Sequence, residues 1–210
     1  ARRAEGCVRW GHALTQARRV ADGVELAFGN GAVERADLVV GADGAWSKVR
    51  PLLSDVRPQH AGITLYELSL PEVDTAHPAL AALVGRGTLI AKGNGCTLFA
   101  QRNAHAHVRV YASLPQALGD GEAAPVHTRA SLLLQFQDWH PDLRRLIADA
   151  LDTVRPWPIH ALPVDHRWAH CDAVTLIGDA AHLMPPAGEG ANLALRDAAD
   201  LGDALCAADW

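Results

Sequence analysis

Residues 174–198 read VTLIGDAAHLMPPAGEGANLALRDA, a short apolar run followed by Gly-Asp, a Pro- and Gly-containing loop and an Ala- and Leu-rich segment. A continuous apolar run without alternation is typical of a strand covered on both faces, as in a parallel sheet. We therefore expect a buried strand over 173–177 and a helix over 190–207. Small residues along that helix allow close packing on a sheet. The order strand, loop, helix indicates an α/β domain of the nucleotide-binding type.

A second unit of the same kind lies earlier, at residues 36–53, with the sequence ADLVVGADGAWSKVRPLL. Its apolar run predicts a second buried strand over 37–41, which Asp43-Gly44 terminates. Ser47, Lys48 and Arg50 are expected on a helix that follows. Taken alone, a strand followed by Asp-Gly is equally typical of an ordinary turn.

Gly178 and Asp179 come just after the expected strand, where open α/β sheets bind ligands at the carboxyl ends of their strands. The short Asp179 side chain can accept hydrogen bonds from sugar or ribityl hydroxyls. In the loop, Pro186 is preceded by a second proline, so two backbone donors are missing and the chain is stiffened. A simple strand-loop-helix connection with incidental glycines is the alternative for this stretch.

The loop ends at Gly188 and Gly190, which let the backbone approach a ligand closely. Ala191 and Asn192 then open the helix, whose N-terminal N–H groups favour negative charge. A reduced flavin is anionic near N1 and the C2 carbonyl, so its pyrimidine edge suits this position.

The rest of the chain predicts a β-meander and then a mixed domain. Strands are expected over 8–14, 24–28 and 33–35, with a hairpin at 29–31, in the first part. In the middle, strands are expected over 63–70, 88–91, 96–101 and 108–114, and helices over 79–84, 127–139 and 141–151. The overall prediction is an α/β nucleotide-type domain, 1–55 and 166–210, with an inserted substrate domain of mixed sheet and helices at 56–165.

Composition excludes some classes of function. The net charge of the 210 residues is −5, which disfavours nucleic-acid binding. No apolar run approaches the roughly 20 residues of a membrane span. The four cysteines are scattered without CxxC spacing, which fits reduced thiols in a cytoplasmic protein.

Other candidate residues are weaker. His105 and His107 lie two apart on an expected strand, but no third ligand has suitable spacing, so a solvated face is favoured and no metal is expected. Arg109, Tyr111 and Ser113 alternate along one strand face, which either lines a substrate pocket or faces solvent. His182 follows Asp179, but no nucleophile is placed to complete a triad, and loop packing is the favoured role.

Together, GADGAWSKVR at 41–50 and GDAAHLMPPAGEGAN at 178–192 resemble the Asp-Gly and Gly-Asp motifs of the class A flavoprotein monooxygenases, the family of aromatic hydroxylases and tetracycline-inactivating flavin enzymes. The order of the motifs and the mixed domain between them are also similar. The resemblance implies an FAD-dependent monooxygenase that uses NADH or NADPH and O₂ to hydroxylate a small organic substrate through a flavin C4a-hydroperoxide.

The resemblance also implies roles for individual residues. Asp179, beside Gly178, would bind the ribityl chain, and the backbone of 188–192 would hold the pyrimidine edge. The Pro186 carbonyl would lie near the reactive face of the flavin. Asp43, with Gly44, and Arg50 match the motif associated with both FAD and the nicotinamide cofactor. No acid–base dyad is expected of the side chains, because the cofactor supplies the chemistry.

One departure from the family pattern is large. The family begins with a strand, a G-x-G-x-x-G turn and a helix that hold the FAD pyrophosphate, and no such pattern precedes residue 37. We therefore expect an internal fragment of a longer protein. A flavin reductase or dehydrogenase on the same scaffold, or a non-catalytic binding module, remains the alternative.

Overall fold

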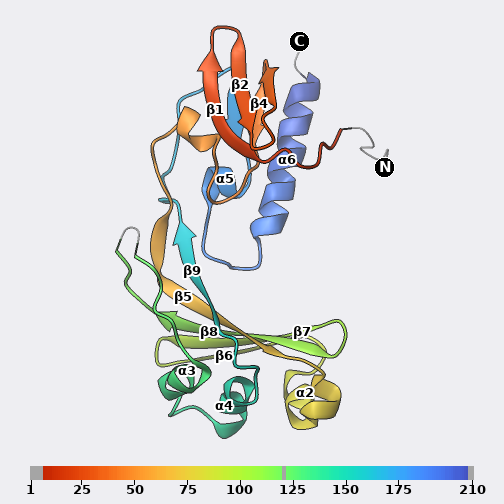
Figure 1. The fold of residues 1–210 in the computed structure, drawn as a ribbon, viewed down its shortest axis with the longest axis vertical. Helices are drawn as coiled ribbons and strands as arrows, with labels where there is room; N and C mark the ends of the chain where they lie inside the picture. Colours follow the sequence, from red (N-terminus) through yellow and green to blue (C-terminus); the bar gives the residue numbers. More distant parts are fainter. Residues whose placement is uncertain (1–6, 120–121, 208–210) are drawn as a thin grey trace. The chain divides into compact units, whose positions relative to one another are not determined.

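A computed structural model describes residues 7–119 and 122–207 of the chain (Figure 1). Residues 1–6 and 208–210, at the ends of the expected nucleotide-type segments, lie outside the described residues, as do residues 120–121. The chain divides into two compact units. Unit 1 comprises Ala1–Gln59 and His160–Trp210, and unit 2 comprises His60–Ile159.

Unit 1 contains the two buried strands that the apolar runs predict. β4 (Val39–Gly41) and β10 (Val174–Leu176) pair in parallel, with Val174 opposite Val39 and Leu176 opposite Gly41. The pair comes from opposite ends of the chain, and the side chains of Val39, Val174 and Leu176 are all buried. Both strands are therefore buried, as expected of apolar runs without alternation, and the structure pairs them with each other.

The expected meander is present, but its first strand was predicted in the wrong place. β1 (Leu14–Val20), β2 (Gly23–Phe28) and β3 (Val33–Ala36) form an antiparallel sheet in chain order. The prediction of a strand over 8–14 is wrong, since β1 begins where it was expected to end. A register irregularity between Leu14 and Gln16 shifts the side-chain alternation of β1, which concealed the strand.

The helix expected at Ser47, Lys48 and Arg50 is also wrong. Only a single 3₁₀ turn, η1 (Arg50–Leu52), forms there, with Pro51 inside it. The preceding residues are held in a turn instead, because the side chains of Asp43 and Ser47 take up their backbone N–H groups. Side-chain acceptors of this kind compete with helical hydrogen bonding.

Unit 2 is a five-stranded sheet with helices on one face (Figure 1). The strand order is β6 (Thr88–Gly93), β7 (Cys96–Asn103), β8 (His107–Pro115), β5 (Gln59–Leu70) and β9 (Arg155–Ala161). The helices are α1 (Val73–Ala76), α2 (Pro78–Val84), α3 (Arg129–Gln135) and α4 (Pro141–Ala148).

Even-numbered and odd-numbered strand residues lie on opposite faces of this sheet. Even-numbered residues of three strands are buried in the same core as α2, α3 and α4: Tyr66, Leu68 and Leu70 of β5, Leu98 and Ala100 of β7, and Val108, Val110 and Ala112 of β8. Odd-numbered residues of these strands point to the opposite face, since side chains alternate along a strand. No helix among the described residues of unit 2 covers that opposite face (Figure 1).

Strand β9 was not predicted, because Pro156 and Pro158 interrupt its sequence. It forms at the edge of the sheet, beside β5. Residues two apart direct their backbone toward the same side of a strand, so two prolines at alternate positions leave the other side able to pair. Proline is tolerated in sheets at such edges.

The helix expected over 127–139 is shorter, running as α3 from 129 to 135 with Thr128 as its N-cap. The helix expected over 141–151 also ends early. Leu146, Ile147 and Ala150 are buried as the periodicity predicts, but Leu151 is 51% exposed. The Leu151 N–H donates to the Ser69 carbonyl of β5 at 2.9 Å, so the chain has left the helix at that point.

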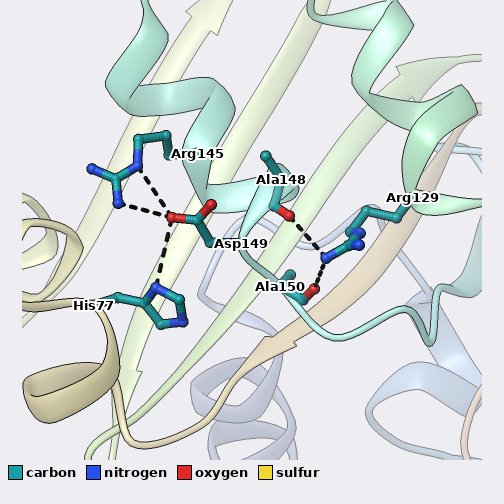
Figure 2. A network of polar contacts seen from close by, with 6 residues as sticks. All are labelled: His77, Arg129, Arg145, Ala148, Asp149 and Ala150. Atoms are coloured by element: carbon teal, nitrogen blue, oxygen red, sulfur yellow. Dashed lines mark hydrogen bonds and ion pairs between the residues drawn. The ribbon is translucent and has the colours of Figure 1, made fainter.

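A polar network fixes the end of α4 against its neighbours (Figure 2). Asp149 accepts hydrogen bonds from Arg145 at 2.9 and 3.1 Å, and its carboxylate lies 3.6 Å from Nδ1 of His77, the N-cap of α2. Arg129 of α3 donates to the carbonyls of Ala148 and Ala150. These carbonyls lack helical partners, so the guanidinium satisfies them.

The last helix, α6 (Gly190–Ala207), forms over the predicted range, and none of its residues is buried. It follows a four-residue helix, α5 (Asp179–His182), that the sequence did not predict. Within residues 7–119 and 122–207, no helix has both the length and the apolar character needed to cross a membrane.

The close packing of side chains around Gly41 in β4 leads to a stability prediction. A Cβ at Gly41 would lie 2.6 Å from Cδ2 of Leu176 and 2.8 Å from Cβ of Val49. Gly41→Ala should therefore lower the free energy of unfolding by about 1–3 kcal/mol through overpacking. Urea denaturation measures the change.

Gly202→Ala is the matched control, because a Cβ there meets nothing within 4 Å and the position is helical. It should raise stability by about 0.5–1 kcal/mol. Equal stability of the two variants would contradict the packing of β4 described here.

Candidate functional site

The carboxyl ends of β4 and β10 open onto a cavity of about 670 Å³ within unit 1. The residues that line it come from both motifs and from the first turns of α6: Ala42, Gly44, Ile177, Gly178, Asp179, Gly190, Ala191, Ala194 and Leu195. Parallel strands bring the two motifs to one edge of the sheet, which is where open α/β sheets bind ligands. The cavity is therefore the candidate site.

Gly178 sets the shape of the turn that leaves β10. Its φ of 58° and ψ of −143° are accessible to glycine and strained for other residues. A Cβ at this position would lie 3.0 Å from Cβ of Ala194, so the missing side chain also permits close approach of α6. Glycine is required here both for the backbone angle and for the packing of the helix.

The carbonyl groups of α5 are held by side chains from elsewhere in unit 1. Arg50 is 3% exposed, and its guanidinium donates to the Ala180 carbonyl at 2.8 Å and the Asp179 carbonyl at 3.1 Å. It also donates to Ala45 at 2.9 Å, within its own motif. The Nδ1 of His166 lies 2.9 Å from the Ala181 carbonyl oxygen. A short helix leaves its carbonyls without internal partners, and these side chains satisfy them.

Burial lowers the pKa of the Arg50 guanidinium, while the negative charge of Asp43 acts in the opposite direction. An arginine side chain stays protonated under either influence. The buried charge is compensated by the carbonyl dipoles of both motifs, so Arg50 joins the motifs as a structural residue.

Asp43 shapes the first motif. Its Oδ2 accepts hydrogen bonds from the N–H groups of Lys48 at 2.7 Å and Val49 at 3.3 Å. The Ser47 hydroxyl oxygen accepts a hydrogen bond from the backbone N–H of Arg50 at 2.9 Å. The turn that these contacts form directs the Arg50 side chain toward α5.

A carboxylate of α6 holds the second motif from the other side. Oδ2 of Asp197 accepts from the Gly178 N–H at 2.7 Å and lies 2.6 Å from Nε2 of His182. Burial acts to raise the pKa of Asp197, but the hydrogen bonds from Gly178 and His182, together with the charges of His182 and Arg196, outweigh it and lower the pKa below its usual value. Asp197 is therefore ionised at neutral pH.

The cavity brings together five of the ten residues that the sequence singled out as a cofactor site. These are Gly44, Gly178, Asp179, Gly190 and Ala191. The other five do not line it: Asp43 and Arg50 make the contacts above, while Pro186, Gly188 and Asn192 lie exposed on the loop and the first turn of α6. His182 contacts Asp197, which agrees with the packing role expected of it.

The lining suits a ligand that is both flat and polar at its edge. Ile177, Ala194 and Leu195 offer apolar surface, and a Cβ at Gly44 or Gly190 would meet nothing within 4 Å, so the backbone there is open to a ligand. The exposed Asp179 carboxylate accepts hydrogen bonds from hydroxyl groups. The first N–H groups of α6 have no helical acceptor and can donate to a ligand carbonyl. This donor and acceptor set fits a flavin with its ribityl chain.

The face of the unit 2 sheet opposite its helices carries a second group of polar and aromatic residues. Ile90, Phe99, Tyr111 and Glu67 are successive cross-strand partners, from β6 to β5. Glu67 accepts a hydrogen bond from Nε1 of Trp157 at 2.9 Å, and its other oxygen lies 3.3 Å from Nε of Arg109.

Arg109, Tyr111 and Ser113 share this face, as their alternation predicts. A hydrogen bond with Tyr111 and the charge of Glu67 raise the pKa of Arg109. The face therefore presents aromatic rings around a compensated ion pair.

The two histidines singled out earlier do not share a strand face. His105 lies in the turn before β8 with a φ of 57°, and only His107 belongs to the strand. The prediction of both on one strand is wrong, because Ala104–Ala106 form a tight turn. His107 lies 2.6 Å from the Ser69 hydroxyl. Across the described ranges, no cluster of three or more His, Cys, Asp or Glu is arranged to hold a metal ion.

Sequence reasoning missed Asp197 and His166 as parts of the site. A signal for Asp197 is present: Gly190, Ala194 and Asp197 lie at i, i+4 and i+7, on one face of α6. A charged residue on the small-residue face of a helix indicates a polar partner beneath it. His166 has no comparable signal, since it lies in an irregular segment and reaches α5 only in the folded chain.

Comparison with known proteins identifies the family of this chain. The model of a family described as "FAD binding domain" matches residues 2–208, and the chain belongs to this family.

Among curated relatives, the chain is 31% identical over 213 residues to Monooxygenase penA of Penicillium thymicola, which covers 82% of this chain and 49% of that protein. It is 31% identical over 201 residues to the FAD-dependent urate hydroxylase of Klebsiella oxytoca, covering 93% of this chain and 50% of that protein. The chain spans about half the length of the curated relatives it matches.

Solved structures show the same fold. Klebsiella pneumoniae HpxO complexed with FAD and uric acid has a TM-score of 0.74 and 25% identity, covering 98% of this chain and 52% of that one. A salicylate hydroxylase substrate complex has a TM-score of 0.67 and 22% identity, covering 87% of this chain and 49% of that one.

The role of Arg50 can be tested by a substitution that keeps its charge. Arg50→Lys replaces the planar guanidinium, which donates to three carbonyl groups at once, by an ammonium group. The variant should therefore have a free energy of unfolding about 2–3 kcal/mol lower. Urea denaturation followed by circular dichroism measures the loss.

Arg18→Lys is the control, since the exposed Arg18 side chain forms an ion pair with Glu25 in the same unit. It should change stability by less than about 0.5 kcal/mol. If the two variants were equally stable, Arg50 would not join the motifs as described.

Proposed function

We propose that the chain is part of an FAD-dependent monooxygenase that uses NADH or NADPH and O₂ to hydroxylate a small organic substrate. The observation that carries this proposal is the cavity at the ends of β4 and β10, with Asp179 and three glycines in its lining, in a chain of the FAD binding domain family. The four cysteines are unpaired, which is compatible with a cytoplasmic location.

In the proposed complex, Asp179, beside Gly178, would hold the ribityl chain of FAD. The first turn of α6, at Gly190, Ala191 and Asn192, would bind the pyrimidine edge of the flavin. The helix N-terminus would favour negative charge at that edge. Gly188 allows the loop backbone to approach the ring.

The remaining motif residues act from the margins of the cavity. Gly44 leaves room for the cofactor, and Asp43 and Arg50 hold the backbone that surrounds it. The Pro186 carbonyl is the group proposed near the reactive face. Bound FAD supplies the redox chemistry with NAD(P)H and O₂, while this chain's residues position the cofactor and exclude water.

We place substrate recognition in unit 2, on the face of its sheet opposite the helices. Phe99, Tyr111 and Trp157 offer aromatic surface for a planar substrate, and Arg109 and Tyr111 offer hydrogen-bond donors at its edge. The pairing of Glu67 with Arg109 and Trp157 fixes these side chains in place. Proteins of similar sequence or fold are named for urate, salicylate and 3-amino-4-hydroxybenzoate, which are planar aromatic compounds.

The cofactor site is tested by Asp179→Ala in the protein expressed from its complete coding sequence. The variant should retain less than about a tenth of the wild-type flavin after gel filtration, because an acceptor for the ribityl hydroxyls is lost. Flavin absorbance per protein measures occupancy.

Asp172→Ala serves as the control, since Asp172 is exposed near the other end of β10 and pairs only with His170 among the described residues. Unchanged flavin occupancy in the Asp179 variant would remove Asp179 from the cofactor site.

The reaction class is tested by oxygen uptake with NADH and NADPH in the presence of urate, salicylate and 3-amino-4-hydroxybenzoate. A monooxygenase should consume O₂ faster with an accepted aromatic compound and release a hydroxylated product, identified by mass spectrometry. Reduction of an artificial electron acceptor without substrate oxygenation would instead indicate a reductase or dehydrogenase on the same scaffold.

A further inference from the structure

The carboxylate of Asp197 connects α6 with the turn that carries Asp179. We propose that Asp197, paired with His182, is a positioning residue of the flavin site: it fixes the Ile177–Gly178 peptide, and so sets where the Asp179 carboxylate points. The inference rests on the proposed FAD site and adds to it a residue that does not line the cavity.

The geometry of the contact is specific. A single oxygen, Oδ2 of Asp197, is 2.7 Å from the Gly178 nitrogen and 2.6 Å from Nε2 of His182. The two donors lie at opposite ends of the α5 segment, one just before Asp179 and one at its last residue. One carboxylate therefore restrains the whole of α5 from the side of α6. Charge-assisted hydrogen bonds of this kind are stronger than neutral ones.

The opposite side of α5 is restrained by Arg50, which donates to the carbonyls of Asp179 and Ala180. The N–H before Asp179 and the carbonyl of Asp179 are thus both held by charged side chains, of opposite sign. Together they fix the orientation of the backbone from which the Asp179 side chain projects. The carboxylate of Asp179 is left exposed at the cavity.

The packing of α6 makes this contact possible. Ala194 lies against Gly178, where no side chain keeps the helix away, and Asp197 is on the same face of the helix one turn later. The same helix lines the cavity through Gly190 and Ala191. Asp197 therefore couples the two parts of the proposed cofactor site, the Gly-Asp turn and the first turn of α6.

Gly178 is the point at which this restraint matters most. Its φ of 58° and ψ of −143° place it in a region that glycine leaves easily, because many backbone conformations are open to it. Without an acceptor for its N–H, the peptide is free to rotate, and Asp179 moves with it. Loss of Asp197 should thus weaken FAD binding without any contact between Asp197 and FAD.

The test uses the protein expressed from its complete coding sequence, with Asp197→Ala, Asp197→Asn, His182→Ala and the Asp197→Ala/His182→Ala double variant. Asp200→Ala is the matched control, since Asp200 lies on the same helix and pairs with exposed Arg196. Two measurements are made: the Kd for FAD, by quenching of flavin fluorescence, and hydrogen exchange of residues 177–184 in the protein without FAD.

Asp197→Ala is expected to raise the Kd about tenfold, through loss of two hydrogen bonds, and to speed exchange at 177–184 about tenfold or more. Asp197→Asn, which keeps an acceptor for Gly178, should recover most of the loss. The double variant should bind FAD no more weakly than Asp197→Ala, because the two residues act as a pair. Asp200→Ala should behave as wild type in both measurements.

Wild-type Kd and wild-type exchange in Asp197→Ala would overturn the proposal. So would a loss of affinity that Asp197→Asn shares in full, with exchange raised throughout unit 1, because that pattern indicates general destabilisation. A wild-type protein that binds no FAD would contradict the proposed function instead, while exchange at 177–184 would still report on the Asp197 contact.

Discussion

One buried guanidinium joins the two motifs on which the site depends. Arg50 reaches the Ala180 carbonyl, 130 residues away in the sequence, and contacts Asp179 and Ala45 as well. Leaving such a charge buried without partners is costly, so the carbonyls must be in place when unit 1 folds. The parallel pairing of β4 with β10 brings them there. The cavity follows from this arrangement, since both strands end at the same edge.

The two units differ in how their faces are used. In unit 1, glycine and alanine let backbone segments approach one another closely. The cavity exists because these residues carry no side chain, or only a methyl group, to fill it. In unit 2, the alternation of strand residues sends apolar side chains to the helices and places Arg109, Tyr111 and Glu67 on the other face. The proposed division of labour, a cofactor held by backbone and a substrate chosen by side chains, follows from these two kinds of packing.

The sequence predicted the features that depend on local pattern. The apolar runs predicted β4 and β10 as two buried strands, and Gly178 to Ala191 predicted the turn and helix that line the cavity. The parallel pairing of the two strands with each other is seen only in the structure. The family resemblance is confirmed by the match over residues 2–208.

The turn at residues 43–50 was missed for a local reason, since Asp43 and Ser47 accept hydrogen bonds from nearby backbone N–H groups and replace the expected helix by a turn. Features that depend on distant contacts were not predictable, and β9 tolerates its prolines only because it lies at a sheet edge. The contacts of Asp197 with Gly178 and of His166 with Ala181 likewise exist only after α5 and α6 have packed.

The most direct test of the central claim is hydrogen exchange of the protein expressed from its complete coding sequence, with and without FAD. FAD should protect residues 42–50 and 177–195, which surround the cavity, more strongly than the helices of unit 2. Protection confined to other segments, or no change on adding FAD, would contradict the assignment of this cavity as the flavin site.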